Sequence, residues 1–212
     1  MRALLERLGA EVPAEEFVRL YKASAVEAER WWRDEHRGYR TADRIRWLLA
    51  QLAIERPEHC EHIAQTVAEI DDSLTSVPPP LLDGAAEGIR ALASRYRLGI
   101  ISDTGFVSGR AQDNLLAQDG LLEHFAATVY SVDVGHAKPR PEPFQRALEL
   151  LGVSPGEVIH VGDIERTDIA GALSAGMRAV RLDQMRPGAS SDAEYVATSY
   201  EDLVGYLLEA GN

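Results

Sequence analysis

The sequence predicts an α/β protein in which a parallel β-sheet follows an amino-terminal helical module. No strand pattern precedes residue 96, and three consecutive prolines interrupt the chain within 76–85. After this interruption, short apolar runs alternate with helical patterns. Strands that alternate with helices are joined by crossover connections and therefore run parallel. We expect a helical module at residues 1–77 and an α/β domain at residues 78–212.

The first module shows apolar residues at intervals of three and four. Leu4, Leu5 and Leu8 form a short apolar face that ends at Gly9, and Pro13 is suited to the start of a second helix that reaches Trp32. Thr41 is a candidate N-cap for a third helix, and Pro57 is suited to the start of a fourth. The tryptophans, Trp31 among them, recur among leucines, and we interpret them as core residues, with pocket lining as the alternative.

The second part follows an alternating order that begins with a helix. The expected helices are 83–95, 108–118, 141–151, 168–175 and 199–209, and the expected strands are 97–102, 127–132, 157–163 and 178–183. Ligands of open parallel sheets bind beyond the carboxyl ends of the strands. Residues that follow these strands are therefore the candidates for a functional site.

Composition narrows the classes of function. The formal net charge is −12, which disfavours nucleic acid and anionic membranes as partners. A single cysteine, Cys60, excludes an internal disulfide and a cysteine zinc site. No apolar window is long enough to span a membrane, and the first residues do not resemble a secretory signal. We expect a cytoplasmic protein.

Two segments after predicted strands carry groups suited to binding a phosphoryl oxygen. Ser102 ends an apolar run and is followed by Asp103, Thr104 and a glycine, so that a hydroxyl lies near backbone N–H groups. Lys138 lies in a loop stiffened by prolines, where its ammonium would neutralise an anionic group. The alternatives are an ordinary turn serine and a solvated surface lysine.

A third segment, "VGDIERTD", places Asp163 and Asp168 just after a buried strand. Burial of two carboxylates is costly unless a cation offsets their charge. Mg²⁺ binds one or two carboxylates and keeps several waters, and it suits this pair. The alternative is that Asp168 caps the next helix and Asp163 is a turn residue.

Taken together, the three segments resemble the haloacid dehalogenase-like superfamily. Ser102, the "AKPRPEPF" stretch with Lys138, and "HVGDIERTDIAGALSAGM" with its two aspartates occur in the family's order. The helical residues 10–76 resemble the four-helix cap of many members. The resemblance covers nearly the whole chain, and it implies a Rossmann-like parallel sheet.

The resemblance also implies an activity. Members that act on phosphates use Mg²⁺ and keep the acidic pair, whereas members that dehalogenate 2-haloacids usually lack it. By resemblance, the chain is a Mg²⁺-dependent phosphatase for a small phosphorylated substrate. Ser102 would then hold a phosphoryl oxygen together with Asp103 and Thr104, Lys138 would stabilise its charge, and Asp163 and Asp168 would ligate the metal.

The family's first motif, an Asp-x-Asp-x-Thr stretch that ends the first strand and supplies the nucleophile, is not found. "IDDSLT" at 70–75 carries adjacent aspartates on a helical pattern, and we interpret Asp71 and Asp72 as solvated helix-end residues. Without the first strand, the neighbouring strands would keep unpaired N–H and C=O groups. We expect either association between chains, such as a homodimer that covers the gap, or a rearranged amino-terminal segment.

Three hypotheses follow from the missing motif. The chain is a shortened form of a phosphatase whose activity belongs to a longer chain. Alternatively, it hydrolyses phosphate esters through a metal-activated water, or with Asp103 as the base or nucleophile. In the third hypothesis the chain is catalytically inactive and binds phosphate, metal or a protein partner.

Overall fold

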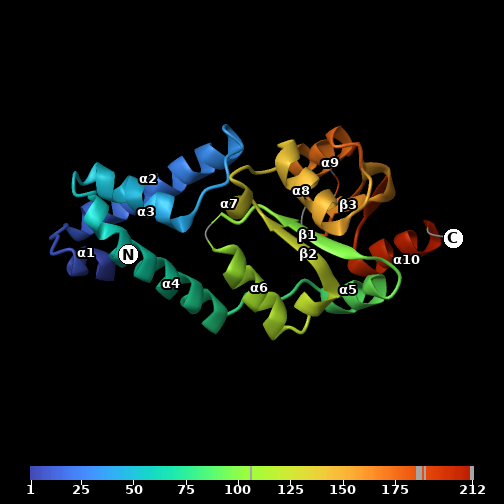
Figure 1. The fold of residues 1–212 in the computed structure, drawn as a ribbon, viewed down its shortest axis with the longest axis horizontal. Helices are drawn as coiled ribbons and strands as arrows, with labels where there is room; N and C mark the ends of the chain where they lie inside the picture. Colours follow the sequence, from blue (N-terminus) through green and yellow to red (C-terminus); the bar gives the residue numbers. More distant parts are fainter. Residues whose placement is uncertain (106, 185–187, 189, 211–212) are drawn as a thin grey trace.

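The computed structural model describes residues 1–105, 107–184, 188 and 190–210. The first part of the chain is helical, as the sequence predicts. Its helices are α1 (Arg2–Arg7), α2 (Ala14–Arg33), α3 (Thr41–Gln51), the 3-10 turn η1 (Pro57–His59) and α4 (Cys60–Ser76). They form the body at the left of Figure 1, away from the strands. No described helix is long and apolar enough to cross a membrane.

The second part alternates helices and strands. Its elements are α5 (Ala85–Ala93), β1 (Leu98–Ser102), α6 (Gly109–Gln118), η2 (Leu122–His124), β2 (Phe125–Tyr130), α7 (Ser131–Val134), α8 (Pro141–Leu151), η3 (Pro155–Glu157), β3 (Ile159–Gly162), the π-helical turn η4 (Glu165–Ile169), α9 (Ala170–Ser174), β4 (Arg178–Leu182), β5 (Tyr195–Ala197) and α10 (Tyr200–Ala210). The predicted α/β class with parallel strands is confirmed.

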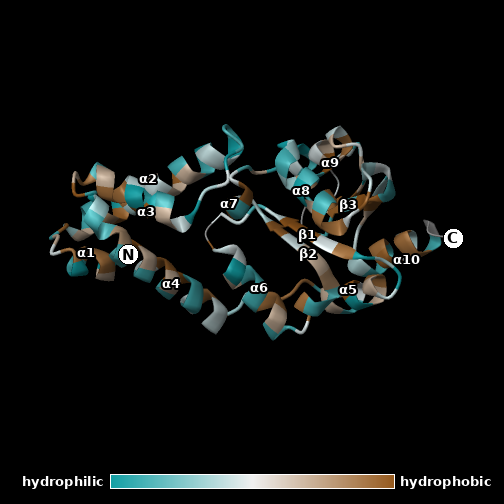
Figure 2. Ribbon diagram, in the orientation of Figure 1, coloured by the Kyte–Doolittle hydropathy of each residue, from teal (hydrophilic) through white to brown (hydrophobic). Residues whose placement is uncertain are grey.

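The strands form two parallel sheets. Strand β1 pairs with β2, and a second sheet has the order β3-β4-β5. In Figure 1, α8 and α9 lie above β1 and β2, α5 and α6 lie below these strands, and α10 lies beside their right-hand end. Figure 2 shows hydrophobic colour along the strands, which these helix layers enclose. The central strand that the family resemblance implies is absent from the described residues, so the sheet is in two parts.

The amino-terminal segment does not fill the gap between the two sheets. Residues Arg2–Arg7 form α1, and buried Leu4 and Leu5 pack with Ile45, Leu49 and Ile63 of the other cap helices. The alternative of a rearranged amino-terminal segment that covers the gap is therefore wrong. The apolar spacing of Leu4 and Leu5 suits a helix that packs on helices, which explains why this segment remains in the cap.

Strand β2 ends two residues earlier than the sequence predicts. Residues 131–134 form the single helical turn α7, which is closed by a hydrogen bond from the Gly135 N–H to the Ser131 carbonyl at 2.8 Å. Gly135 has a φ of 81°, a conformation that glycine adopts without strain. This glycine turns the chain toward the loop that carries Lys138.

Of the two aspartates on α4 that the sequence interprets as solvated, only one is exposed. Asp72 is exposed as expected, but Asp71 is only 3% exposed. Its carboxylate accepts hydrogen bonds from the Ser108 N–H at 3.2 Å and the Ser108 hydroxyl at 2.6 Å. Ser108 is the N-cap of α6, so Asp71 anchors the cap helix α4 to the core. The periodicity of α4 could not identify a partner 37 residues away.

Replacing Asp71 with alanine is expected to destabilise the protein by about 1–3 kcal/mol, because it leaves two partly buried donors of Ser108 without their acceptor. The free energy of unfolding, measured by urea titration, tests this expectation. Asp72→Ala is the matched control on the same helix, and we expect a change within about 0.5 kcal/mol. Equal effects of the two substitutions would contradict a specific anchoring role of Asp71.

Candidate active site

A cavity of about 490 Å³ lies where the cap meets the carboxyl ends of β1 and β3. Both the cap and the core contribute residues to the wall of this cavity. The cap supplies Ala25, Ala28, Glu29, Trp32, Tyr39 and Arg44, and the core supplies Asp103, Gly105, Lys138, Asp163, Ile164, Thr167 and Asp168. The loops after β1 and β3 and the loop before α8 therefore converge, as expected for the carboxyl edge of a parallel sheet.

Lys138 is buried rather than solvated. Its side chain is 11% exposed, and its Nζ lies 2.7 Å from Oδ1 of Asp168. The same Nζ donates a hydrogen bond to the Ile101 carbonyl of β1 at 3.0 Å. The ammonium therefore links the end of β1 to the turn after β3, and the alternative of a surface lysine is wrong.

Asp168 is held by several groups at once. Its Oδ2 accepts a hydrogen bond from the Ile164 N–H at 2.9 Å, within the π-helical turn η4. Burial raises the pKa of the Asp168 carboxyl, but nearby His160 and the Lys138 ammonium outweigh burial and hold this pKa below its ordinary value. Asp168 is therefore ionised and turned back toward β3, and it does not cap the following helix.

Gly162, the last residue of β3, permits this arrangement. A Cβ at Gly162 would lie 2.3 Å from the Asp168 Cβ and 2.5 Å from its Cγ. Only glycine allows the turn to bring the carboxylate this close to the strand. The glycine before Asp163 thus places Asp168 beside Lys138.

Asp103 connects the cap and the core. Its Oδ1 accepts a hydrogen bond from the Lys138 N–H at 3.1 Å, and its Oδ2 accepts one from Trp32 Nε1 at 3.0 Å. The guanidinium of Arg166 lies 5.2 Å from the Trp32 ring centroid, which adds a cation–π contact from the core. Trp32 thus belongs to the cavity, whereas Trp31, which is 6% exposed, is a core residue as predicted.

The remaining candidates occupy different positions. Asp163 is half-buried, lines the cavity, and has no hydrogen bond or ion pair to the described residues. Ser102 and Thr104 flank Asp103 and do not line the cavity. Thr104 is 3% exposed, and its hydroxyl has no hydrogen-bond partner in the part of the chain that the structure describes. Four of the six predicted site residues therefore share one cavity.

The described residues contain no cluster of three or more histidine, cysteine, aspartate or glutamate side chains arranged to hold a metal ion. Any cation at this site would rely on the two predicted aspartates, water and a bound ligand. Sequence reasoning missed Thr167, which is 1% exposed on η4. It also missed the cap residues Tyr39 and Arg44, because helical spacing does not show which face of a cap meets a distant loop.

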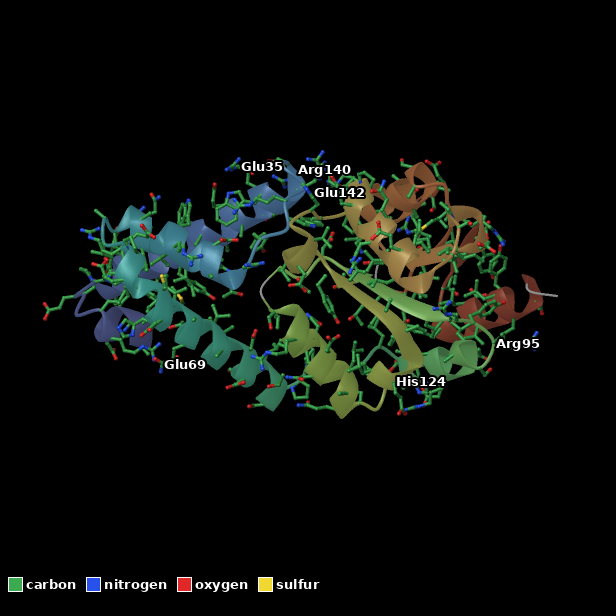
Figure 3. All side chains as sticks on the ribbon, in the orientation of Figure 1. Glu35, Glu69, Arg95, His124, Arg140 and Glu142 are labelled. Atoms are coloured by element: carbon green, nitrogen blue, oxygen red, sulfur yellow. The ribbon has the colours of Figure 1, made fainter. Side chains whose placement is uncertain are left out.

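Backbone pairing joins the cap to the loop that carries Lys138. The Gly38 N–H donates to the Gly135 carbonyl at 3.1 Å, and the Ala137 N–H donates to the His36 carbonyl at 2.9 Å. Figure 3 labels Glu35 on the cap side of this junction, and Arg140 and Glu142 on the core side. The Lys138 position therefore depends on contacts from both parts of the molecule.

A family model for haloacid dehalogenase-like hydrolases matches residues 2–176, which is most of the chain. The chain belongs to this family. The resemblance of the three sequence segments to the haloacid dehalogenase-like superfamily is thereby confirmed. The structure agrees with the family fold apart from the gap between β1 and β3.

Several relatives of this haloacid dehalogenase-like chain are phosphatases by name. A phosphoserine phosphatase of Thermus thermophilus is 39% identical over 103 residues, which cover 48% of this chain and 41% of the relative. A pyrophosphatase PpaX of Bacillus mycoides is 32% identical over 117 residues, which cover 53% of this chain and 52% of the relative. The chain thus spans about half the length of these relatives.

Solved structures show the same fold. A HAD phosphatase from Thermococcus onnurineus superposes with a TM-score of 0.63 at 23% identity, covering 96% of this chain and 84% of that one. A 2-haloacid dehalogenase from Pseudomonas syringae superposes with a TM-score of 0.70 at 22% identity, covering 99% and 88%. Because phosphatases and dehalogenases share this fold, the fold of a family member does not distinguish the two chemistries.

Proposed function

We propose that the chain hydrolyses phosphate monoesters of small molecules in the cavity between cap and core. The family and the names of its relatives support a hydrolase of this class. The observation that carries the proposal is the convergence of the buried Lys138 ammonium with Asp163 and Asp103 on one cavity.

In this proposal Lys138 stabilises the charge of the phosphoryl group. The Lys138 ammonium has three N–H donors, and two of them point to the Ile101 carbonyl and to Asp168. The third direction is suited to an anionic oxygen of the substrate. A charge fixed before the reaction contributes more to stabilising the transition state than one that must reorganise. Ser102 and Thr104, which do not line the cavity, are given no role in this proposal.

Asp103 is the candidate base. The Trp32 indole and the Lys138 N–H each occupy one of its oxygens, and every carboxylate oxygen has a second lone pair available to water. Because both oxygens are already engaged, Asp103 is better placed to orient an attacking water than to attack directly. Because Trp32 comes from the cap, the arrangement requires the cap to lie against the core as it does here.

The residues present fit a Mg²⁺ ion that keeps most of its waters. The Asp163 carboxylate lines the cavity with no protein partner among the described residues, and Asp168 lies beside the same cavity. Mg²⁺ binds in this manner through one or two carboxylates and a substrate phosphate. When bound, it would offset the negative charge that gathers between the aspartates and the phosphoryl oxygens.

A second candidate function is binding of a phosphorylated ligand without turnover. Both oxygens of Asp103 already accept hydrogen bonds, and the described residues hold no three-ligand metal cluster. A cavity with a fixed ammonium and no free nucleophile would still bind a phosphate group. In both candidates the cavity binds a phosphate group, but only in the first is the phosphate ester hydrolysed.

Hydrolysis of p-nitrophenyl phosphate by the purified chain tests the proposal. We expect turnover that requires Mg²⁺, stops with EDTA, and falls by at least about 100-fold in Asp163→Asn. Asp72→Asn, an exposed change on α4, is the control for a general loss of charge. Turnover that survives both EDTA and Asp163→Asn would contradict the assigned site. Calorimetric binding of inorganic phosphate without any turnover would favour the second candidate.

A further inference from the structure

A second cavity, of about 610 Å³, lies along strand β2. It shares no lining residue with the cavity that holds Lys138. Thr128, Val129 and Tyr130, three successive residues of β2, line it. Successive side chains of a strand point to opposite faces of the sheet, so a cavity that contacts all three lies along the edge of the strand. The second cavity is therefore a groove beside the outer edge of β2.

The outer edge of β2 has no neighbouring strand in the part of the chain that the structure describes. Strand β2 pairs with β1 on its other side, and no other described loop or strand bonds to the backbone of residues 126–129. Proteins commonly protect such edges with lysine, proline or a very short strand. Strand β2 has the sequence FAATVY, without charge or proline, whereas β5 at the end of the other sheet has three residues. The edge of β2 is therefore open to pairing.

One face of helix α8 forms the wall of the groove. Its lining residues recur at intervals of three and four, and they are Glu142, Gln145, Arg146, Glu149 and Leu150. This face is about 12 Å long and the three strand residues span about 10 Å, so the groove accommodates about three or four extended residues. Leu150 is 42% exposed and offers an apolar contact.

Carboxylates outnumber cations in the groove. Asp133, Glu142 and Glu149 line it, and Arg146 is the only lysine or arginine among its described lining residues. The Arg146 guanidinium donates to Glu149 at 3.2 Å, so these two charges offset each other. Asp133 has no ion pair with a described residue, and the buried Oε2 of Glu142 has no hydrogen-bond partner among them. Uncompensated negative charge therefore remains at Asp133 and Glu142.

We propose that this groove binds an extended, basic peptide segment of another protein, which adds a strand to the outer edge of β2. The backbone of the segment bonds the free N–H and C=O groups of residues 126–129, which supplies affinity in this mode of recognition. Its lysine or arginine side chains meet Asp133 and Glu142, and its apolar side chains contact Leu150. These alternate side chains supply the specificity.

A second copy of this chain fits the groove less well than a basic segment does. Pairing between the β2 edges of two copies would place two acidic grooves against each other. Each copy also carries a formal net charge of −12, which opposes association. A segment of opposite charge removes both difficulties, and we therefore assign the groove to a different protein.

Fluorescence anisotropy with a labelled hexapeptide of alternating lysine and valine tests the groove. We expect saturable binding to the full chain, and protection of amides within 126–129 from hydrogen exchange. The same peptide with glutamate in place of lysine should bind at least about tenfold more weakly. Binding is measured without a phosphate ester, so this test and the phosphatase test fail separately.

Two N-methylated peptides distinguish strand addition from attraction by charge alone. Successive N–H groups of a strand point to opposite sides, so a strand added at an edge bonds β2 through one set of alternate nitrogens. Methylation of the valine nitrogens or of the lysine nitrogens keeps every charge. We expect one set to weaken binding by at least about tenfold and the other by less than about twofold. Equal effects of the two sets, or absence of saturable binding, would overturn the proposal.

Reversal of charge in the groove completes the test. The double variant Asp133→Lys, Glu142→Lys should reduce the preference for the lysine peptide over the glutamate peptide by at least about tenfold. Asp72→Lys, an exposed change on α4, is the control and should leave this preference unchanged. Circular dichroism checks that both variants fold, and Glu142→Gln, expected to weaken binding of the lysine peptide about threefold, replaces a double variant that does not. An unaltered preference or affinity would contradict the assigned groove, as would a homodimer that protects amides within 126–129 without peptide.

Discussion

Replacing Lys138 with methionine is expected to destabilise the protein by about 3–5 kcal/mol, because it leaves the buried Asp168 carboxylate without its cation. The ion pair spans 2.7 Å, and both side chains are nearly buried. The same substitution removes the hydrogen bond to the Ile101 carbonyl. Urea unfolding followed by circular dichroism measures the effect.

The controls for this substitution are available within the chain. Lys22 is exposed and is the only other lysine, and Lys22→Met should change the free energy of unfolding by less than about 0.5 kcal/mol. The double variant Lys138→Met, Asp168→Asn removes both charges and should recover part of the lost stability. No recovery in the double variant would show that the ion pair is not the cause of the loss.

Gly162→Ala is expected to destabilise the chain by at least about 3 kcal/mol, because the new methyl group would occupy the space of the Asp168 side chain. The contact distances of 2.3 and 2.5 Å are too short for any repacking that keeps Asp168 in place. Displacement of Asp168 would also release Lys138, so the substitution should abolish the proposed phosphatase turnover. Thermal and urea unfolding measure the first effect.

Gly156→Ala is the matched control for Gly162→Ala. Its Cβ would have no neighbour within 4 Å, and its backbone does not require a positive φ. We expect a change within about 0.5 kcal/mol. A Gly162→Ala variant as stable as this control would mean that the turn after β3 relaxes without cost, and the close approach of Asp168 would then have no structural role.

Much of the fold follows from the sequence because its periodicities are strong. The apolar runs around β1, β3 and β4 and the helix from Pro141 to Leu151 occur where they were predicted. Strand β5 was missed because three residues give too short a pattern to recognise. The end of β2 was misplaced because Val132 and Val134 continue an apolar run, and Gly135 closes it into a helical turn.

The sequence predicts where the site lies better than it predicts which side chains bond to one another there. Strand ends and loop prolines indicated Lys138, Asp163 and Asp168, because the carboxyl edge of a parallel sheet gathers such residues. Partners distant in the chain gave no local signal. Nothing in the spacing of α2 indicates that Trp32 bonds Asp103, and nothing in α4 indicates that Asp71 is buried. Such pairings depend on packing between elements, which a single sequence does not encode locally.

The short backbone pairing between 36–38 and 135–137 has a mechanical consequence. It holds the cap within one residue of Lys138, at a point far along the chain from the covalent connection at 77–84. If the cap rotates while these hydrogen bonds persist, it must rotate about them. Lys138 then keeps its position while the cavity opens. If the cap moves so that these hydrogen bonds break, the loop that carries Lys138 loses a support as well. Ligand entry and the position of the ammonium therefore depend on the same pairing.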